Sequence, residues 1–179
     1  MWDITFLQLF DRCLKLHASG RRDYESFFEK EDIAFLDSIG YQPREFYDFV
    51  EDLNNEQEPA ASTALLIAAV RRDYFRIKQA SQRSSHVILR DELPTFGDTL
   101  EGIAYLPRII SKARGKLRGE LDPDIMYGCG GDRHFLAQHG NIHPADFLRH
   151  VWAAGDDDRT IANFVTGAKA SSHDHGLTP

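Results

Sequence analysis

The sequence contains few cysteines and no long apolar run. Cys13 and Cys129 are too few for a disulfide framework and lack the paired spacing of a metal site. No stretch approaches the ~20 consecutive apolar residues that a membrane helix needs. The first residues carry no basic region ahead of an apolar segment, so we do not expect a secretory signal. These absences predict a soluble protein of a reducing cytoplasm with no membrane segment.

Positive charge is also in deficit. The 179 residues include 21 basic and 28 acidic side chains, for a formal net charge of −7. This balance argues against a surface built to hold nucleic acid or anionic lipid, so we expect neither as a partner. The chain also lacks a glycine-rich phosphate loop, a nucleophile elbow and a Cys-x-x-Cys pair. We therefore expect no cofactor, and no familiar class of enzyme is indicated.

Two segments about 100 residues apart share one pattern. FLDSIGYQPREFYDFV (35–50) and FLAQHGNIHPADFLRHV (135–151) each place a glycine where one helix would end and a proline in the first turn of the next. Upstream, FLQLFDRCLKLHASG (6–20) aligns with YLPRIISKARGKLRG (105–119). Such collinear order is typical of an internal duplication, although chance matches of common residues would give part of it. We predict an all-α fold of two related helical units.

Apolar periodicity predicts the elements of each unit. The opening stretches are amphipathic helices that end at Gly20 and Gly119, and shorter helices follow near 31–39 and 132–139. STALLIAAVRRDYFRIKQ predicts the longest helix, and DDRTIANFV its counterpart. The pattern divides the chain into an N-terminal repeat (1–79), a connector (80–102), a C-terminal repeat (103–166) and a polar tail (167–179) that we expect to be mobile.

The segments LPTFGDTLEG, LPRIISKARGKLRGEL, YGCGGDRHFL and AAGDDDRTIANFV resemble a bacterial family of small helical domains of unknown function. The resemblance covers about residues 94–166 and is carried by Leu-Pro-Arg, Lys-Ala-Arg and Tyr-x-Cys followed by an aspartate. It implies a helical fold and a bacterial source, and it assigns no catalytic residue. The Gly130-Gly131 pair departs from the bulkier residues typical of many members.

One side of the opening helix changes character between the two copies. The positions that match Leu9, Cys13 and Leu16 hold Arg108, Lys112 and Gly115. Arg108 and Lys112 lie four residues apart on one helical face, which can present two donors to a small anion. We predict an anion-binding groove formed by Arg108, Lys112 and Arg114, with Tyr127 as an apolar wall. The alternative is ordinary surface charge, solvated or paired with the acids of EFYDFVED.

Cys129 and Asp132 form a second candidate site. Glycines let the chain turn tightly around Cys129, and the following helix N-terminus favours a reactive thiol. Cys129 would then be a nucleophile or a redox sensor, assisted by Asp132. The alternatives are a simply buried cysteine and an aspartate that only caps the helix, a role that Asp32 would share.

Histidines gather between 134 and 150, but their spacings do not converge, so no metal site is expected. The leading interpretation is a helical binding or interaction module for a small anionic ligand. One alternative is a small cytoplasmic enzyme or redox sensor that uses Cys129. Another is a homodimer whose interface is an aromatic surface formed by EFYDFV (45–50) and RRDYF (71–75).

Overall fold

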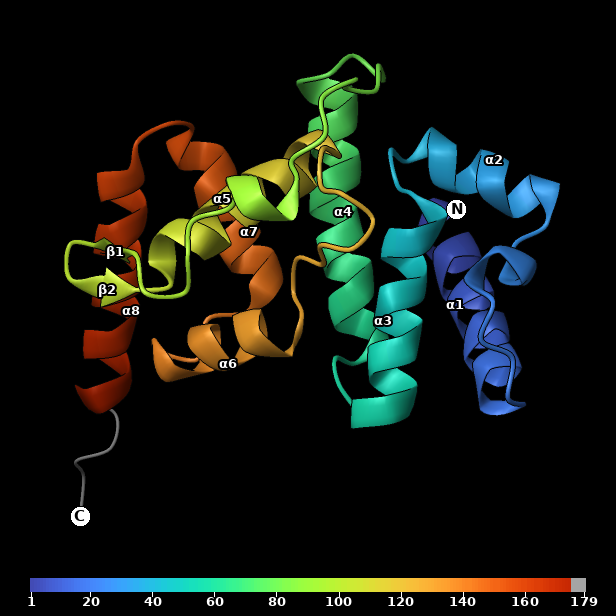
Figure 1. Ribbon diagram of the computed structural model, residues 1–179, viewed down its shortest axis with the longest axis horizontal. Coiled ribbons are helices and arrows are strands. Elements are labelled where there is room, and N and C mark those ends of the chain that lie inside the picture. The colour runs from blue at the N-terminus through green and yellow to red at the C-terminus, as the bar shows by residue number, and fades with distance from the viewer. Residues whose placement is uncertain (175–179) are drawn as a thin grey trace. The chain divides into compact units, whose positions relative to one another are not determined.

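The computed structural model describes the backbone of residues 1–174 and the side chains of residues 1–170. In this part of the chain the fold is predominantly helical, as predicted, with one short β-hairpin that the sequence did not predict (Figure 1). The chain divides into two compact units, Met1–Ser85 and His86–Pro179. The division falls inside the segment expected to be a connector.

The first unit consists of four α-helices and a short 3₁₀ helix. These are α1 (Trp2–Ala18), η1 (Tyr24–Phe27), α2 (Lys30–Ser38), α3 (Pro43–Glu56) and α4 (Ala61–Ile77). Helix α1 packs against α3 and α4. Aromatic rings fill the contact: the ring centroid of Phe46 lies 4.9 Å from that of Phe6 and 5.5 Å from that of Phe10. Edge-on ring pairs of this kind give the unit an aromatic core.

Two expectations about the first unit are wrong. Leu7, an apolar residue of the amphipathic helix expected in 6–20, is 40% exposed, whereas Cys13 on the same helix is fully buried. The aromatic residues proposed as a dimer surface lie in the core, because Phe46, Tyr47 and Phe75 are buried. That aromatic surface therefore does not exist as an exposed patch, although the burial of these rings does not test the homodimer itself.

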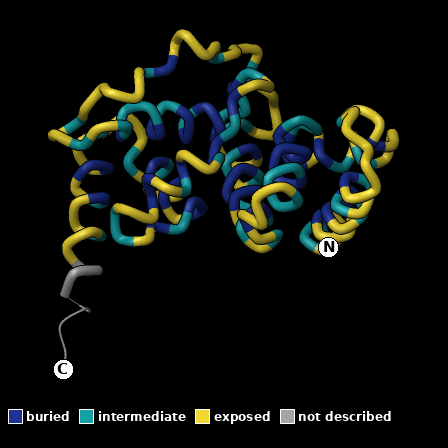
Figure 2. The backbone as a smooth tube through the Cα atoms, turned by 60° about the horizontal axis from the view of Figure 1, so that its bottom comes forward, coloured by how far each residue is buried: buried dark blue, intermediate teal, exposed yellow. Residues whose placement is uncertain are grey.

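The second unit begins with the 3₁₀ turn η2 (Arg90–Glu92) and a two-stranded antiparallel hairpin. Its elements continue as β1 (Thr99–Leu100), β2 (Ile103–Ala104), α5 (Leu106–Arg118), α6 (Gly130–Gln138), α7 (Pro144–Ala154) and α8 (Asp158–Asp174). Helix α5 packs on α7, α7 packs on α8, and β1 contacts both α5 and α8. The apolar residues that recur at helical spacing in α5 are all buried, namely Leu106, Ile109, Ile110, Ala113 and Leu117. Figure 2 shows how buried and exposed positions alternate along these helices.

The predicted glycine and proline boundaries are confirmed. Gly40 and Gly140 follow α2 and α6 with φ of +70° and +89°, a left-handed conformation that favours glycine. A Cβ on Gly40 would lie 2.5 Å from Phe75 Cγ, and one on Gly140 would lie 2.4 Å from the backbone of Ala168. Both turns therefore need glycine for space as well as for conformation. Pro43 and Pro144 begin α3 and α7.

Helix α8 is longer than the segment DDRTIANFV suggested. It continues to Asp174 and so includes the first part of the segment 167–179 that we expected to be mobile. Residues 175–179 lie outside the described residues. Within the described part of the chain, no helix combines the length and apolar character needed to cross a bilayer.

Candidate functional site

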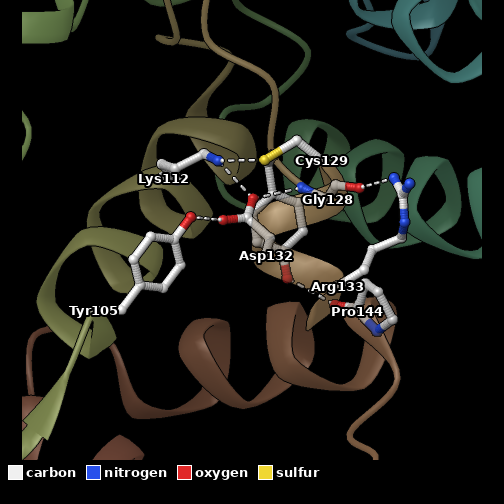
Figure 3. Close-up of polar contacts among 8 residues, drawn as sticks. Tyr105, Lys112, Gly128, Cys129, Asp132, Arg133 and Pro144 are labelled. Carbon is white, nitrogen blue, oxygen red and sulfur yellow. Dashed lines mark hydrogen bonds and ion pairs between the residues drawn. The ribbon is translucent and has the colours of Figure 1, made fainter. Parts of the chain in front are cut away.

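A buried carboxylate organises the second unit. Asp132, in the first turn of α6, is completely buried and its two oxygens accept three hydrogen bonds. Lys112 Nζ donates to Oδ2 over 2.6 Å, the Gly128 amide donates to Oδ2 over 2.8 Å, and the Tyr105 hydroxyl donates to Oδ1 over 2.7 Å (Figure 3). A buried charge needs such partners to offset the loss of hydration. Asp132 therefore joins α5, the loop before α6 and α6 itself.

The basic residues that replace apolar ones on α5 were expected to form an anion-binding face, but the structure buries part of that face. Lys112 and Gly115 are buried, as Cys13 is in the first unit, so these two positions of α5 do not face solvent. Lys112 is tolerated there because Asp132 pairs with it. The arginine that precedes the matching position in α1, Arg12, likewise pairs with Asp32 of α2.

Neither aspartate is the helix N-cap that the sequence suggested. Cys129 is the N-cap of α6 and Glu29 that of α2, so Asp132 and Asp32 each occupy the third helical position. Asp32 still serves the helix start, because its Oδ2 accepts the Glu29 amide over 2.7 Å. The carboxylates therefore reach back to the preceding loop rather than forward along the helix.

Cys129 lies at the same place as the anion-site candidates. Cys129 is partly exposed, and its Sγ accepts a hydrogen bond from Lys112 Nζ over 3.2 Å. Arg133 steadies the loop by donating to the Gly128 carbonyl over 2.8 Å (Figure 3). The other cysteine is very different: Cys13 is buried, and this burial raises the pKa of its thiol to about 12. Lys112 and Cys129, which the sequence assigned to separate sites, are therefore in contact.

A pocket of about 340 Å³ opens over this site. Besides Lys112 and Cys129, its lining includes Arg90, Tyr105, Arg108, Asp124 and Gly131. Arg108 donates to the Pro94 carbonyl over 2.7 Å, and its guanidinium carbon lies 4.4 Å from the Phe96 ring centroid. Arg90 donates to the Asp124 carbonyl over 2.7 Å. Basic side chains thus outnumber the single acid in the lining.

The structure separates the other two predicted ligand-binding residues from the pocket lining. Arg114 donates two hydrogen bonds to the Gly155 carbonyl and pairs with Asp158 over 2.7 Å, which connects α5 to the turn before α8. Tyr127 is buried, and its hydroxyl donates to the Pro144 carbonyl over 2.7 Å. The side chains of Arg114 and Tyr127 therefore stabilise contacts within the second unit.

Tyr105 is a pocket residue that sequence reasoning missed. It is the N-cap of α5 and has a φ of +72°, a left-handed conformation uncommon for a residue with a side chain. Burial, followed by the negative charge of Asp132, raises the pKa of Tyr105 well above its ordinary value, so the hydroxyl stays a donor. The missed residues Arg90 and Phe96 belong to the expected connector, where no periodic pattern marks a site. Across the described residues, no three side chains of His, Cys, Asp or Glu gather as a metal cluster would.

Residues 95–176 match the model of a family described as a domain of unknown function (DUF5069). The matched segment contains every pocket residue discussed above except Arg90. No curated protein and no solved structure shows significant similarity to the chain. The comparisons therefore place the site within a family segment of unknown function and name no ligand or reaction.

Proposed function

We propose that the protein is a binding module whose second unit holds a small anionic group, such as a phosphate or a carboxylate. The observation that carries this proposal is Arg108: it lines the pocket, yet its partners are a neutral carbonyl and an aromatic ring. Within the described residues it forms no ion pair. A guanidinium of this kind retains donors that suit an oxyanion.

The rest of the pocket supports the same chemistry. Lys112 is held by Asp132, so its ammonium reaches the pocket lining in a fixed position. Gly131 lies in the first turn of α6, where backbone amides have no acceptor within the helix. An anion between Arg108 and Gly131 would therefore meet an arginine, a fixed lysine and a helix N-terminus.

Isothermal titration of the full chain with inorganic phosphate tests the proposal. We expect saturable binding that Arg108→Gln weakens by about tenfold or more, because a hydrogen bond to a charged group contributes roughly 1.5–3 kcal/mol. Arg149→Gln is the matched control, since Arg149 is an exposed arginine of α7 that pairs with Asp146. The proposal fails if the wild-type chain shows no saturable binding, or if Arg108→Gln binds phosphate as tightly as the control.

As a second candidate, we propose that Cys129 is a reactive thiol, either a nucleophile or a redox sensor. The contact between its sulfur and Lys112 Nζ, together with its place in the pocket lining, supports this role. Alkylation with iodoacetamide at neutral pH, followed by mass spectrometry, should modify Cys129 much faster than the buried Cys13. Equal and slow modification of both cysteines would exclude the reactive thiol.

We also propose that the two units arose by internal duplication. Helices α2 and α6 each have nine residues, carry an aspartate at the third position and precede a left-handed glycine. In each unit that aspartate pairs with a basic residue of the opening helix. An experimental structure in which segments 6–50 and 105–151 fail to superimpose would exclude a duplication.

The homodimer, the cytoplasmic location and the bacterial source remain predictions from the sequence. Light scattering of the full chain tests the homodimer.

A further inference from the structure

A second pocket, of about 470 Å³, adjoins the anion pocket. Its lining includes His134, Phe135 and Gln138 of α6. Tyr105 and Gly131 line both pockets, so these two residues form the boundary that the pockets share. The space available beyond Gly131 is more than an isolated oxyanion would use.

The chemistry of the second pocket differs from that of the first. Its walls include the rings of Tyr105 and Phe135, whose centroids lie 5.5 Å apart. On the side of the anion pocket, Tyr105 stacks on Phe96, which is 69% exposed. Aromatic rings therefore follow one another from the first pocket into the second. Ring surfaces of this kind favour a planar group in a ligand.

The edge of the second pocket supplies hydrogen-bonding groups. His134 Nε2 and Gln138 Nε2 lie 2.9 Å apart on the exposed side of α6. None of the residues that line this pocket is acidic. An amide and an imidazole beside aromatic walls can pair with the polar edge of a heterocycle as well as with water.

We propose that the two pockets act as one groove, and that its ligand carries an anionic group joined to a planar ring. The anionic group lies at Arg108 and Gly131, and the ring lies beyond Tyr105 in the second pocket. This inference rests on the proposed anion site and adds the class of ligand. Two classes of ligand combine an anionic group with a planar ring in this way, namely nucleoside monophosphates and simple aromatic phosphates.

Titration calorimetry of the full chain with four probes separates these cases. The probes are inorganic phosphate, ribose 5-phosphate, phenyl phosphate and adenosine 5′-monophosphate. We expect at least one of the two ring-bearing probes to bind about tenfold more tightly than ribose 5-phosphate, as stacking on aromatic side chains predicts. Tighter binding of adenosine 5′-monophosphate than of phenyl phosphate identifies a nucleotide as the ligand class. Tighter binding of phenyl phosphate identifies a simple aromatic phosphate.

Variants of the second pocket provide the structural control. Gln138→Ala and His134→Ala remove exposed side chains that bond to each other, so folding should be unaffected. Each should weaken the ring-bearing probe by about threefold or more and leave ribose 5-phosphate unchanged. If neither ring-bearing probe binds more tightly than ribose 5-phosphate while Arg108→Gln weakens phosphate binding as expected, this inference is overturned and the anion site stands. If phosphate binding does not depend on Arg108, both are overturned.

Discussion

Lys112 of α5 and Asp132 of α6 form a buried ion pair, with 2.6 Å between Nζ and Oδ2 and side chains that are 5% and 0% exposed. The same ammonium donates to Cys129 Sγ, and the same carboxylate accepts the Tyr105 hydroxyl. The pair therefore fixes the position of two pocket residues at once. Any change to it should alter the stability of the second unit as well as the pocket.

Breaking this pair from either side should be strongly destabilising. Asp132→Asn leaves the Lys112 ammonium buried without a counter-charge, and Lys112→Met leaves the Asp132 carboxylate with only neutral donors. We expect each variant to lower the free energy of unfolding by about 3–5 kcal/mol, measured by urea denaturation. The double variant removes both charges and should cost less than the sum, with a coupling energy of about 1–3 kcal/mol. Additive losses would mean that the two charges do not interact in solution.

The helices of the second unit were predictable because local signals and packing agree. The apolar positions of α5 recur at helical spacing, and the same positions are buried. Gly140 and Pro144 mark the end of α6 and the start of α7 through conformational properties that depend on no distant contact. The short hairpin at 99–104 was missed because two-residue strands carry no detectable alternation.

The site was only partly predictable, because its parts depend on tertiary contacts. Sequence reasoning identified Arg108, Lys112 and Cys129 but assigned them to two separate sites. Charge in a helix suggested exposure, whereas Lys112 is buried through a partner twenty residues away. Nothing in the sequence signals that Tyr105 adopts a left-handed conformation that brings its hydroxyl to Asp132. Such pairings become visible only when two helices are placed against each other.

Tyr127 should matter for stability and not for binding. Tyr127→Phe removes the hydrogen bond to the Pro144 carbonyl and leaves that acceptor without this partner in the core. We expect a loss of about 1–2 kcal/mol in the free energy of unfolding, with phosphate affinity unchanged in calorimetry. A clear loss of phosphate affinity would restore the role as a pocket wall that the sequence suggested.

Cys13 should make the first unit sensitive to alkaline pH. Its pKa is raised by burial from 9.0 to about 12, so the folded state keeps a proton that the unfolded state loses. The stability contributed by the neutral thiol is complete below pH 9 and is lost as the pH rises toward 12. Between pH 8 and pH 10.5, the free energy of unfolding of the wild-type chain should therefore fall more than that of Cys13→Ala. Parallel pH profiles for the two proteins would contradict this prediction.

Two glycines of the second unit should respond in opposite ways to the same added methyl group. A Cβ on Gly115 would lie 2.4 Å from Leu121 Cδ2 and 3.0 Å from Ile88 Cδ1, so Gly115→Ala must displace packed side chains. We expect it to cost about 1–3 kcal/mol of stability by overpacking while leaving phosphate affinity unchanged.

A Cβ on Gly131 would meet only Tyr105 Oη at 3.4 Å and Cys129 Sγ at 4.0 Å, at the boundary that the two pockets share. Alanine is the better helix former by roughly 0.8–1 kcal/mol, so Gly131→Ala should fold at least as stably as the wild-type chain. Its methyl group would occupy space that a bound ligand needs, and the affinity for phenyl phosphate should fall by about tenfold. Gly115→Ala should lower stability and leave binding unchanged, whereas Gly131→Ala should keep stability and weaken binding. Thermal denaturation and calorimetry of these two variants therefore distinguish a ligand groove from a packing defect. Undiminished binding by Gly131→Ala would show that no ligand passes between Tyr105 and α6.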